Sequence, residues 1–94
     1  MSYRVEFHEG VEKDLRALPT RLRTRAMTVA LALADEPRPP GAEALQQNLK
    51  GILRVRVQDY RIAYEVIDAE QRVIVWQVAN RHEFYAKLLR RLGR

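Results

Sequence analysis

A run of alternating apolar and basic residues in the second half of the chain most constrains its fold. Between Leu53 and Val57 the apolar residues are separated by Arg54 and Arg56. Successive side chains of a β-strand point to opposite faces, so such a strand places its apolar residues in a core and both arginines on the other face. Arg61 opens the next apolar run after a short gap, which predicts a tight hairpin. The pattern gathers fixed positive charges close to one surface, which suits a phosphate ligand.

The rest of the second half continues this strand pattern. Strands at about 52–57, 61–67 and 72–79 are joined by short connections, so an antiparallel meander is the simplest arrangement. The last strand reads Val73–Trp76 without alternation, which predicts a place inside the sheet with both faces covered. One face of the middle strand carries Ile62, Tyr64 and Val66. The chain also opens with a half-buried strand, in which the alternating apolar residues are Tyr3, Val5 and Phe7.

Helical spacing of apolar residues predicts three helices. The first two form a helical hairpin interrupted at Pro19, and Thr20 is expected to cap the second helix. Proline cannot continue a helix, so the cluster that begins at Pro37 ends the hairpin. Residues 43–49 are predicted to form a loop or short turn. The apolar stripes of the hairpin are Val11, Leu15 and Leu18, then Leu22, Ala26, Val29 and Leu33.

These elements predict one α+β domain spanning residues 1–94, in the order β-α-α-β-β-β-α. The N-terminal helical hairpin packs on a small, mostly antiparallel four-stranded sheet. A C-terminal helix at about 83–92 covers the other side of the sheet. The aromatic residues assigned to the core are Tyr60, Tyr64, Trp76 and Phe84.

Composition narrows the class of function. Seventeen Lys and Arg against twelve Asp and Glu give a net charge of +5, and the pI near 10.1 is typical of nucleic-acid-binding domains. The absence of cysteine excludes disulfides and thiol chemistry, and two histidines are too few for a zinc site. No signal-peptide core is present, and no apolar run approaches the ~20 residues of a membrane helix. We therefore expect a soluble, cytoplasmic protein without a membrane partner.

Four arginines and one tyrosine are the candidate functional residues. Arg54, Arg56 and Arg61 belong to the hairpin, Arg81 follows the last strand, and Tyr85 lies one helical turn further on. In one concave patch they would suit RNA, because arginine grips phosphate bidentately and a tyrosine ring stacks on a base. These residues can also have ordinary structural roles. An Arg-x-Arg pair on a strand can simply be part of a solvent-exposed face, and a tyrosine at a helix end more often packs against the core than takes part in chemistry.

Two segments resemble a known family. The stretch 53–66, LRVRVQDYRIAYEV, is similar to the signature of RelE-type toxins of the RelE/ParE superfamily of bacterial and archaeal toxin–antitoxin modules. The stretch 78–85, VANRHEFY, resembles its C-terminal motif, an arginine after the last strand and a tyrosine a few residues later. Three further matches extend the resemblance over nearly the whole chain: Tyr3–Phe7, Lys13–Leu15 and Leu49–Gly51.

The resemblance implies a metal-independent mRNA endonuclease that acts on the ribosome and cuts the transcript in the A site. The ribose 2′-hydroxyl attacks the adjacent phosphate and gives a 2′,3′-cyclic phosphate, a step that needs a base, an acid and cations for the charge on phosphorus. By position, Arg54 and Arg61 would stabilise that charge. Arg81 would lie by the leaving group as acid or electrostatic partner, Arg56 by the 2′-hydroxyl, and Tyr85 would stack on or orient the nucleotide.

The chain departs from the family at the positions of Arg54 and Arg56, where well-described members carry lysine. Arginine stays protonated and is a poor general base, whereas a desolvated lysine can lose its proton. Another group must then take the proton, or the patch works by electrostatics alone; the candidates are Lys50, Glu65 and His82, although Glu65 is expected to pair with an arginine. The competing hypotheses are a ParE-type inhibitor of DNA gyrase and a degenerate toxin that only binds its antitoxin.

The resemblance also implies partners. A cognate antitoxin would wrap the domain and neutralise its basic surface, and operator DNA would be bound only through the antitoxin complex. Arginines at the start of the second predicted helix oppose the helix dipole and could meet ribosomal RNA or an acidic antitoxin, although a solvated basic face explains them as well. These arginines are Arg21, Arg23 and Arg25.

Overall fold

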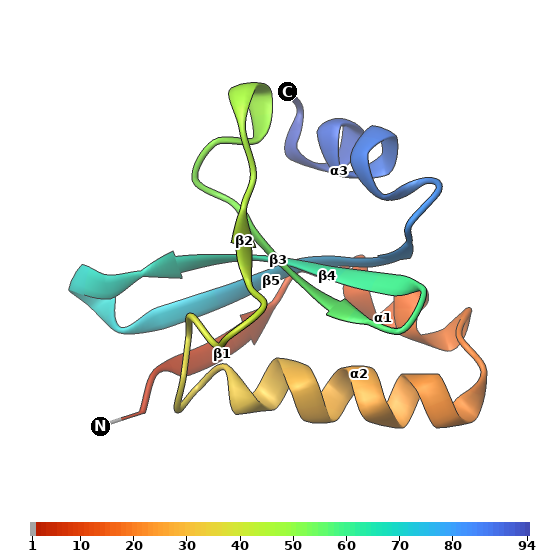
Figure 1. Cartoon of the computed structure of the whole chain (residues 1–94), viewed down its shortest axis with the longest axis horizontal. Helices are drawn as coiled ribbons and strands as arrows, with labels where there is room; N and C mark the ends of the chain where they lie inside the picture. Colours follow the sequence, from red (N-terminus) through yellow and green to blue (C-terminus); the bar gives the residue numbers. More distant parts are fainter. Residues whose placement is uncertain (1) are drawn as a thin grey trace.

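The computed structural model describes residues 2–94, and its centre is a five-stranded sheet with helices on both faces (Figure 1). The strands lie in the order β1-β5-β4-β3-β2. Helices α1 and α2 cover one face, and α3 covers part of the other. The bounds are β1 (Arg4–Phe7), α1 (Val11–Arg16), α2 (Thr20–Ala32), β2 (Glu43–Ala44), β3 (Leu53–Val57), β4 (Tyr60–Ile67), β5 (Arg72–Asn80) and α3 (Phe84–Leu92), with 3₁₀ turns η1 (Gln47–Leu49) and η2 (Asp68–Glu70).

The predicted α+β class, the meander and the helical hairpin are confirmed, but the prediction of four strands is wrong. Residues 43–44 form a fifth strand at the edge, with Glu43 opposite Arg54 and Ala44 opposite Leu53. Both β2 residues are exposed and the strand has two residues, so no alternation of buried and exposed positions marks it in the sequence. Its extended conformation comes from pairing with β3, which is a tertiary effect.

Strand β5 lies inside the sheet, as its continuous apolar run predicts. It pairs in parallel with β1 and antiparallel with β4, and both α1 and α3 contact it. The β4–β5 register shifts between Ala63 and Tyr64: Ala63 opposes Gln77, but Tyr64 opposes Val75. Trp76 is thus an extra residue in β5 and forms a β-bulge. The bulge interrupts the alternation along β5, so the side chains that face α3 follow a different alternation before and after Trp76.

Two hydrophobic clusters lie on the two faces of the sheet. The cluster under α1 and α2 includes Ile62, Tyr64 and Val66, which confirms that these alternate residues share a face. The cluster under α3 contains two small residues of the sheet, Ala63 and Ala79. Small side chains let α3 approach closely, and its anchoring residues are fully buried at 0% exposure: Phe84 and Leu88.

Two turns explain how the elements connect. Val57 pairs with Tyr60, so the β3–β4 hairpin turns on only Gln58 and Asp59, with Gln58 at φ +54°. Helix α2 starts after Pro19, and no side chain caps it, so the prediction that Thr20 is its cap is wrong. Pro19 presets the extended entry to the helix instead, with φ −54° and ψ 146°.

A buried carboxylate joins the first helix to β5 and the last helix. Asp14 of α1 is 4% exposed and accepts a hydrogen bond from the Val78 backbone N–H at 3.0 Å. It also forms ion pairs with Lys87 at 3.0 Å and with Arg91 at 2.7 Å, both on α3. Arg91 donates a further hydrogen bond to the Trp76 carbonyl oxygen at 2.9 Å. α3 is therefore held in place by charge as well as by its apolar face.

The segment after α2 is held against β4 by a hydrogen bond from a buried tyrosine hydroxyl. The Tyr64 hydroxyl donates to the Pro37 carbonyl oxygen at 2.8 Å, and burial raises the pKa of Tyr64 to about 12. Helix α2 ends at Ala32, five residues before Pro37, so the prediction that the proline cluster ends this helix is wrong. The cluster is instead fixed against β4 before the chain reaches β2. None of the helices formed by residues 2–94 combines the length and apolar character that crossing a membrane requires.

Candidate functional site

Three of the predicted arginines share the face of the sheet that α3 covers. Arg54 lies opposite Ala63, Arg56 opposite Arg61, and Arg61 opposite Ala79. Directly opposed residues of antiparallel strands project to the same side, and Ala63 and Ala79 belong to the cluster under α3. Arg54 and Arg56 are two residues apart on β3, about 7 Å along the strand. The predicted grouping of basic residues on one surface is therefore present.

Arg56 and Arg61 bring two positive charges together on adjacent strands. They are cross-strand partners in register, a pairing that like charges disfavour. The ion pairs within residues 2–94 involve neither of them. The Nε of Arg61 is buried and has no hydrogen-bond partner among the described residues. A buried donor without an acceptor costs stability.

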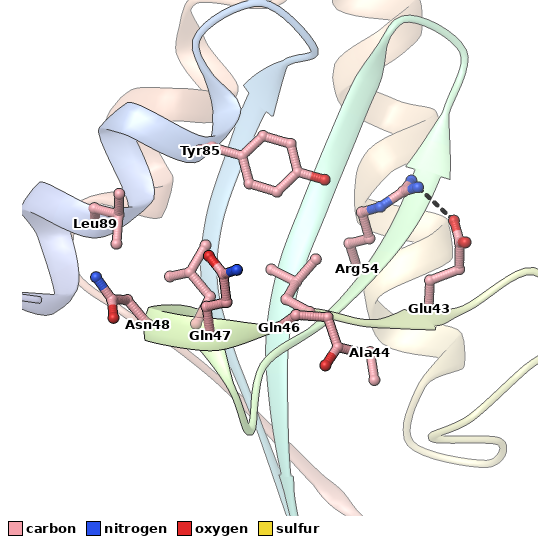
Figure 2. Close-up of a pocket in the computed structure, with 10 residues that line it drawn as sticks. Glu43, Ala44, Gln46, Gln47, Asn48, Arg54, Tyr85 and Leu89 are labelled. Carbon is pink, nitrogen blue, oxygen red and sulfur yellow. Dashed lines mark hydrogen bonds and ion pairs between the residues drawn. The ribbon is translucent and has the colours of Figure 1, made fainter.

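Arg54 lies in a groove with Tyr85, between the sheet, α3 and the segment from β2 to η1. The cavity has a volume of about 450 Å³. Figure 2 shows the Tyr85 ring extending from α3 over the groove, with its hydroxyl on the side of Arg54. The Arg54 side chain is 17% exposed and forms an ion pair with Glu43 of β2. The structure thus brings Arg54 and Tyr85 to one groove, as predicted.

Arg81 lies at the hairpin end of the sheet rather than among the groove residues. Its backbone N–H donates to the Asp59 carbonyl oxygen at 2.9 Å, next to the β3–β4 turn. Its side chain is exposed. Arg81 follows the end of β5, in which Asn80 pairs with Tyr60. The candidate site therefore has two parts: the groove of Arg54 and Tyr85, and a hairpin end that carries Arg56, Arg61 and Arg81.

The exposed Tyr85 is suited to stacking, unlike the other aromatic residues. It is 46% exposed, and its ring meets the Phe84 ring edge-to-face at a centroid distance of 5.1 Å. Tyr64 and Phe84 are fully buried, as predicted, while Tyr60 and Trp76 pack partly buried against the two clusters. Phe84 fixes one side of Tyr85 and leaves its ring surface accessible.

The proton-acceptor candidates lie in different surroundings. The Trp76 Nε1–H donates to Glu65 at 3.2 Å, so the expectation that Glu65 pairs with an arginine is wrong. Lys50 is exposed in the turn before β3, and His82 is exposed in the turn before α3, where Asn80 accepts a hydrogen bond from its backbone N–H. Sequence reasoning missed Glu43, whose carboxylate contacts Arg54 inside the groove. Only the β2–β3 pairing, which no local pattern reveals, places it there.

The arginines of α2 divide into two roles. Arg23 donates to the carbonyl oxygens of Leu15 at 3.0 Å and of Leu18 at 3.2 Å, and so caps the end of α1. It therefore stabilises the helical hairpin. Arg21 and Arg25 are exposed beside a shallow depression shared with Gln58. Residues 2–94 form no group of three or more His, Cys, Asp or Glu side chains placed to hold a metal ion.

Comparison with known proteins gives the family. The family described as ParE toxin of type II toxin-antitoxin system, parDE, matches residues 5–85. The chain therefore belongs to this toxin family, within the RelE/ParE superfamily, which confirms the superfamily resemblance. No curated protein matches significantly.

Several solved structures share the fold. One is the RelBE2 toxin–antitoxin complex of Mycobacterium tuberculosis, with 28% identity and a TM-score of 0.77 over 86% of this chain and 100% of that one. The archaeal RelE–RelB complex of Pyrococcus horikoshii has 29% identity and a TM-score of 0.75 over 86% of this chain and 97% of that one. An E. coli RelE mutant in the free state, with two arginines replaced by alanine, has the same fold at 24% identity, with a TM-score of 0.76 over 98% of this chain and 99% of that one.

Proposed function

We propose that this toxin is a ribosome-dependent mRNA endonuclease, which cuts the message in the ribosomal A site and so inhibits translation. One observation carries the proposal: Arg56 and Arg61 face each other without a counter-anion, and the buried Arg61 Nε has no partner among residues 2–94. A phosphodiester bound across the pair supplies the missing negative charge. The similarity to RelE structures at 28% and 29% identity supports the same reading.

The reaction is an intramolecular transesterification. The ribose 2′-oxygen forms a bond to the adjacent phosphorus, the bond to the 5′-oxygen breaks, and the products carry a 2′,3′-cyclic phosphate and a free 5′-hydroxyl. Negative charge builds on the phosphoryl oxygens in the transition state, and guanidinium groups placed beside it stabilise it. Arg61 and Arg54 bind this charge, Arg56 lies by the 2′-hydroxyl, and Arg81 lies by the leaving 5′-oxygen, which takes up a proton from water to become the free 5′-hydroxyl.

The proton of the 2′-hydroxyl needs an acceptor other than arginine. Arg54 and Arg56 stay protonated, so they act as cations. Glu43 is the carboxylate that lines the groove, and it lies beside Arg54 in an ion pair. In this mechanism Glu43 is the general base, and Tyr85 stacks on the base of the bound nucleotide. No metal ion is required at any step.

A second function is favoured by the family match itself. The matched family is described as the ParE toxin, and a ParE-type toxin would inhibit DNA gyrase. In that case the arginine surface would bind protein or DNA phosphate without cleavage. A supercoiling assay with purified gyrase and purified toxin tests this function directly.

An antitoxin is the expected protein partner. The solved relatives from Mycobacterium tuberculosis and Pyrococcus horikoshii are toxin–antitoxin complexes. We infer a cognate antitoxin that neutralises the basic face of this chain, and binding of operator DNA only through that complex. Because the message and the ribosome are cytoplasmic, the proposal also places the toxin in the cytoplasm.

The decisive experiment is expression from a tightly repressed promoter in growing bacteria, with 5′-end mapping of a translated reporter message. The test variants are Arg61→Ala and Arg81→Ala, and Arg16→Ala, an exposed arginine on the opposite face, is the control. We expect cuts that depend on translation, persist in the control and fall on the order of 100-fold in each test variant. Growth arrest without cuts would favour gyrase inhibition. Absence of both would favour a degenerate toxin that only binds its antitoxin.

A further inference from the structure

The groove beside Arg54 has a wall of amide side chains that the cleavage chemistry leaves unused. Gln46, Gln47 and Asn48 are consecutive, all three are exposed, and all three line the cavity with Arg54 and Tyr85. In Figure 2 this segment runs along the side of the groove below Tyr85, across from the ion pair of Arg54 with Glu43. We refer to the three residues as the amide wall.

The backbone of the amide wall is fixed on both sides. Leu45 and Leu49 flank it, and both are buried in the cluster under α3. The Leu45 N–H donates to the Ile52 carbonyl oxygen at 2.8 Å, and the Leu49 N–H donates to the Gln46 carbonyl oxygen at 3.0 Å. These bonds use main-chain groups and leave the side-chain amides free for a ligand. The segment is therefore a preorganised surface rather than a mobile loop.

The middle residue of the amide wall has an unusual backbone conformation. Gln47 has φ +54°, in the left-handed region that residues other than glycine rarely adopt. Its backbone carbonyl oxygen accepts a hydrogen bond from the Lys50 N–H at 3.0 Å, which holds this tight turn. The 3₁₀ turn and the residue before it thus bring three successive amide residues to the lining of one groove, whereas successive side chains of a strand point to opposite faces.

Primary amides suit the recognition of nucleobase edges. Each carries two N–H donors and one carbonyl acceptor, so it matches the paired donors and acceptors along a base edge. Proteins read single-stranded RNA by stacking the base on an aromatic ring and hydrogen-bonding its edge. Tyr85 supplies the ring and Arg54 the phosphate contact. The cavity volume of about 450 Å³ lies in the range of sites for small organic ligands.

We propose that the amide wall is the base-reading subsite of this toxin, in which Gln46, Gln47 and Asn48 hydrogen-bond the edge of a nucleobase that stacks on Tyr85. The ligand is one unpaired nucleotide of RNA, and the subsite sets which sequences are cut. The inference rests on the proposed nuclease function for its consequence, codon preference. Base selectivity in binding tests it without any cleavage step.

The binding experiment uses uncleavable 2′-O-methyl trinucleotides that differ in the central base. The variant carries Gln46→Ala, Gln47→Ala and Asn48→Ala together, and Gln71→Ala, an exposed glutamine at the β4–β5 turn that also has a positive φ, is the matched control. We expect the Kd values of the wild type and the control to differ about tenfold or more between the best and worst base. In the triple variant this spread shrinks to about twofold.

The cleavage experiment maps cut positions over many codons in a translation extract. We expect the triple variant to lose codon preference, because cutting at the codons that the wild type prefers falls toward the level at the other codons. A uniform loss of cutting with the preference retained would overturn the inference, and so would trinucleotide affinities that do not depend on the base. If the wild type makes no cuts, the nuclease function is refuted but the base-reading subsite is not. The subsite is tested separately by the difference in Kd between the best and worst base.

The variants are checked by two further measurements. Thermal unfolding of each variant shows whether the fold is retained, and the conservative change Gln47→Glu replaces amide donors by a carboxylate acceptor of the same shape. If the wall reads base edges, this change alters which base binds best. If it only lowers affinity for every base by the same factor, the negative charge acts on the phosphate and the base-reading role is wrong.

Discussion

The carboxylate of Asp14 offers the sharpest test of what holds α3, and with it Tyr85, over the sheet. We predict that Asp14→Asn strongly destabilises the domain. The substitution keeps the shape of the side chain but removes its charge, which leaves Arg91 and Lys87 without their partner; their side chains are 15% and 30% exposed. Breaking a buried ion pair from one side costs about 3–5 kcal/mol, and the partial exposure of Lys87 favours the lower figure. A loss of ~3 kcal/mol lowers the Tm of a domain of this size by about 15 °C.

The pH dependence of this loss follows from the surroundings of Asp14. Burial alone raises the pKa of the Asp14 carboxyl, but hydrogen bonds from Arg91, the Val78 N–H and Lys87 outweigh it, so the pKa lies below its ordinary value. A carboxyl whose pKa is lower in the folded state stabilises the fold above its unfolded pKa, about 3.9, and this contribution disappears as pH falls through the folded value. The stability difference between wild type and Asp14→Asn should therefore be full at pH 7 and shrink below about pH 4.

The assay is urea unfolding followed by the fluorescence of Trp76, the single tryptophan, whose carbonyl oxygen accepts a hydrogen bond from Arg91. Glu12→Gln is the control on the same helix, because Glu12 is 80% exposed and lies 3.7 Å from Arg16. We expect the control to stay within about 0.5 kcal/mol of wild type. An Asp14→Asn free energy of unfolding within ~1 kcal/mol of wild type at pH 7 would refute the ion-pair argument.

Three further predictions concern charge. Glu43→Gln should lower message cleavage on the order of 100-fold, because it removes the general base. RNA affinity should be kept or increased, because the substitution also removes the anion beside Arg54. Equal loss of cleavage and of RNA affinity would argue for a structural role of Glu43. Arg56→Lys should keep or raise cleavage up to about tenfold, since Arg61 opposite lowers the pKa of a lysine there, and complete loss in the 5′-end mapping would contradict this. Hydrogen bonds from Arg72 and Arg4 lower the pKa of Glu6 to about 2. In acid unfolding, the Glu6→Gln variant should therefore lose less stability than the wild type between pH 4.5 and pH 2. An unchanged pH profile would show that other carboxyls dominate the acid sensitivity.

The regular elements could be predicted because their residues carry periodic patterns. The alternation from Leu53 to Val57 and the helical stripes report directly which face of each element is buried. Strand β2 could not be predicted in this way, since its two exposed residues owe their conformation to β3. The prediction that Thr20 caps α2 was wrong for a related reason. Thr20 is a good capping residue, but the fixed φ of Pro19 already sets the entry to the helix.

The candidate site shows the same division. The arginines of the hairpin share a face because strand alternation requires it, and Tyr85 joins Arg54 because α3 packs over Ala63 and Ala79. Glu43 reaches Arg54 only through pairing of an irregular segment, and no periodic signal encodes that contact. The chemical roles of the arginines remain a prediction, which the cleavage experiments test.

The contacts of Asp14 and Arg91 have a consequence for the solubility of the sheet. Strand β1 pairs with β5 from Arg72 to Val75, and beyond Val75 no other strand of residues 2–94 lies on that side of β5. There the Asp14 carboxylate accepts from the Val78 N–H and the Arg91 guanidinium donates to the Trp76 carbonyl oxygen, so one ion pair occupies main-chain groups that an incoming strand would use. Open strand edges recruit other chains into aggregates, and a charged pair bound to the edge prevents such recruitment. The same two residues that hold the last helix also block this stretch of β5 from pairing with another strand.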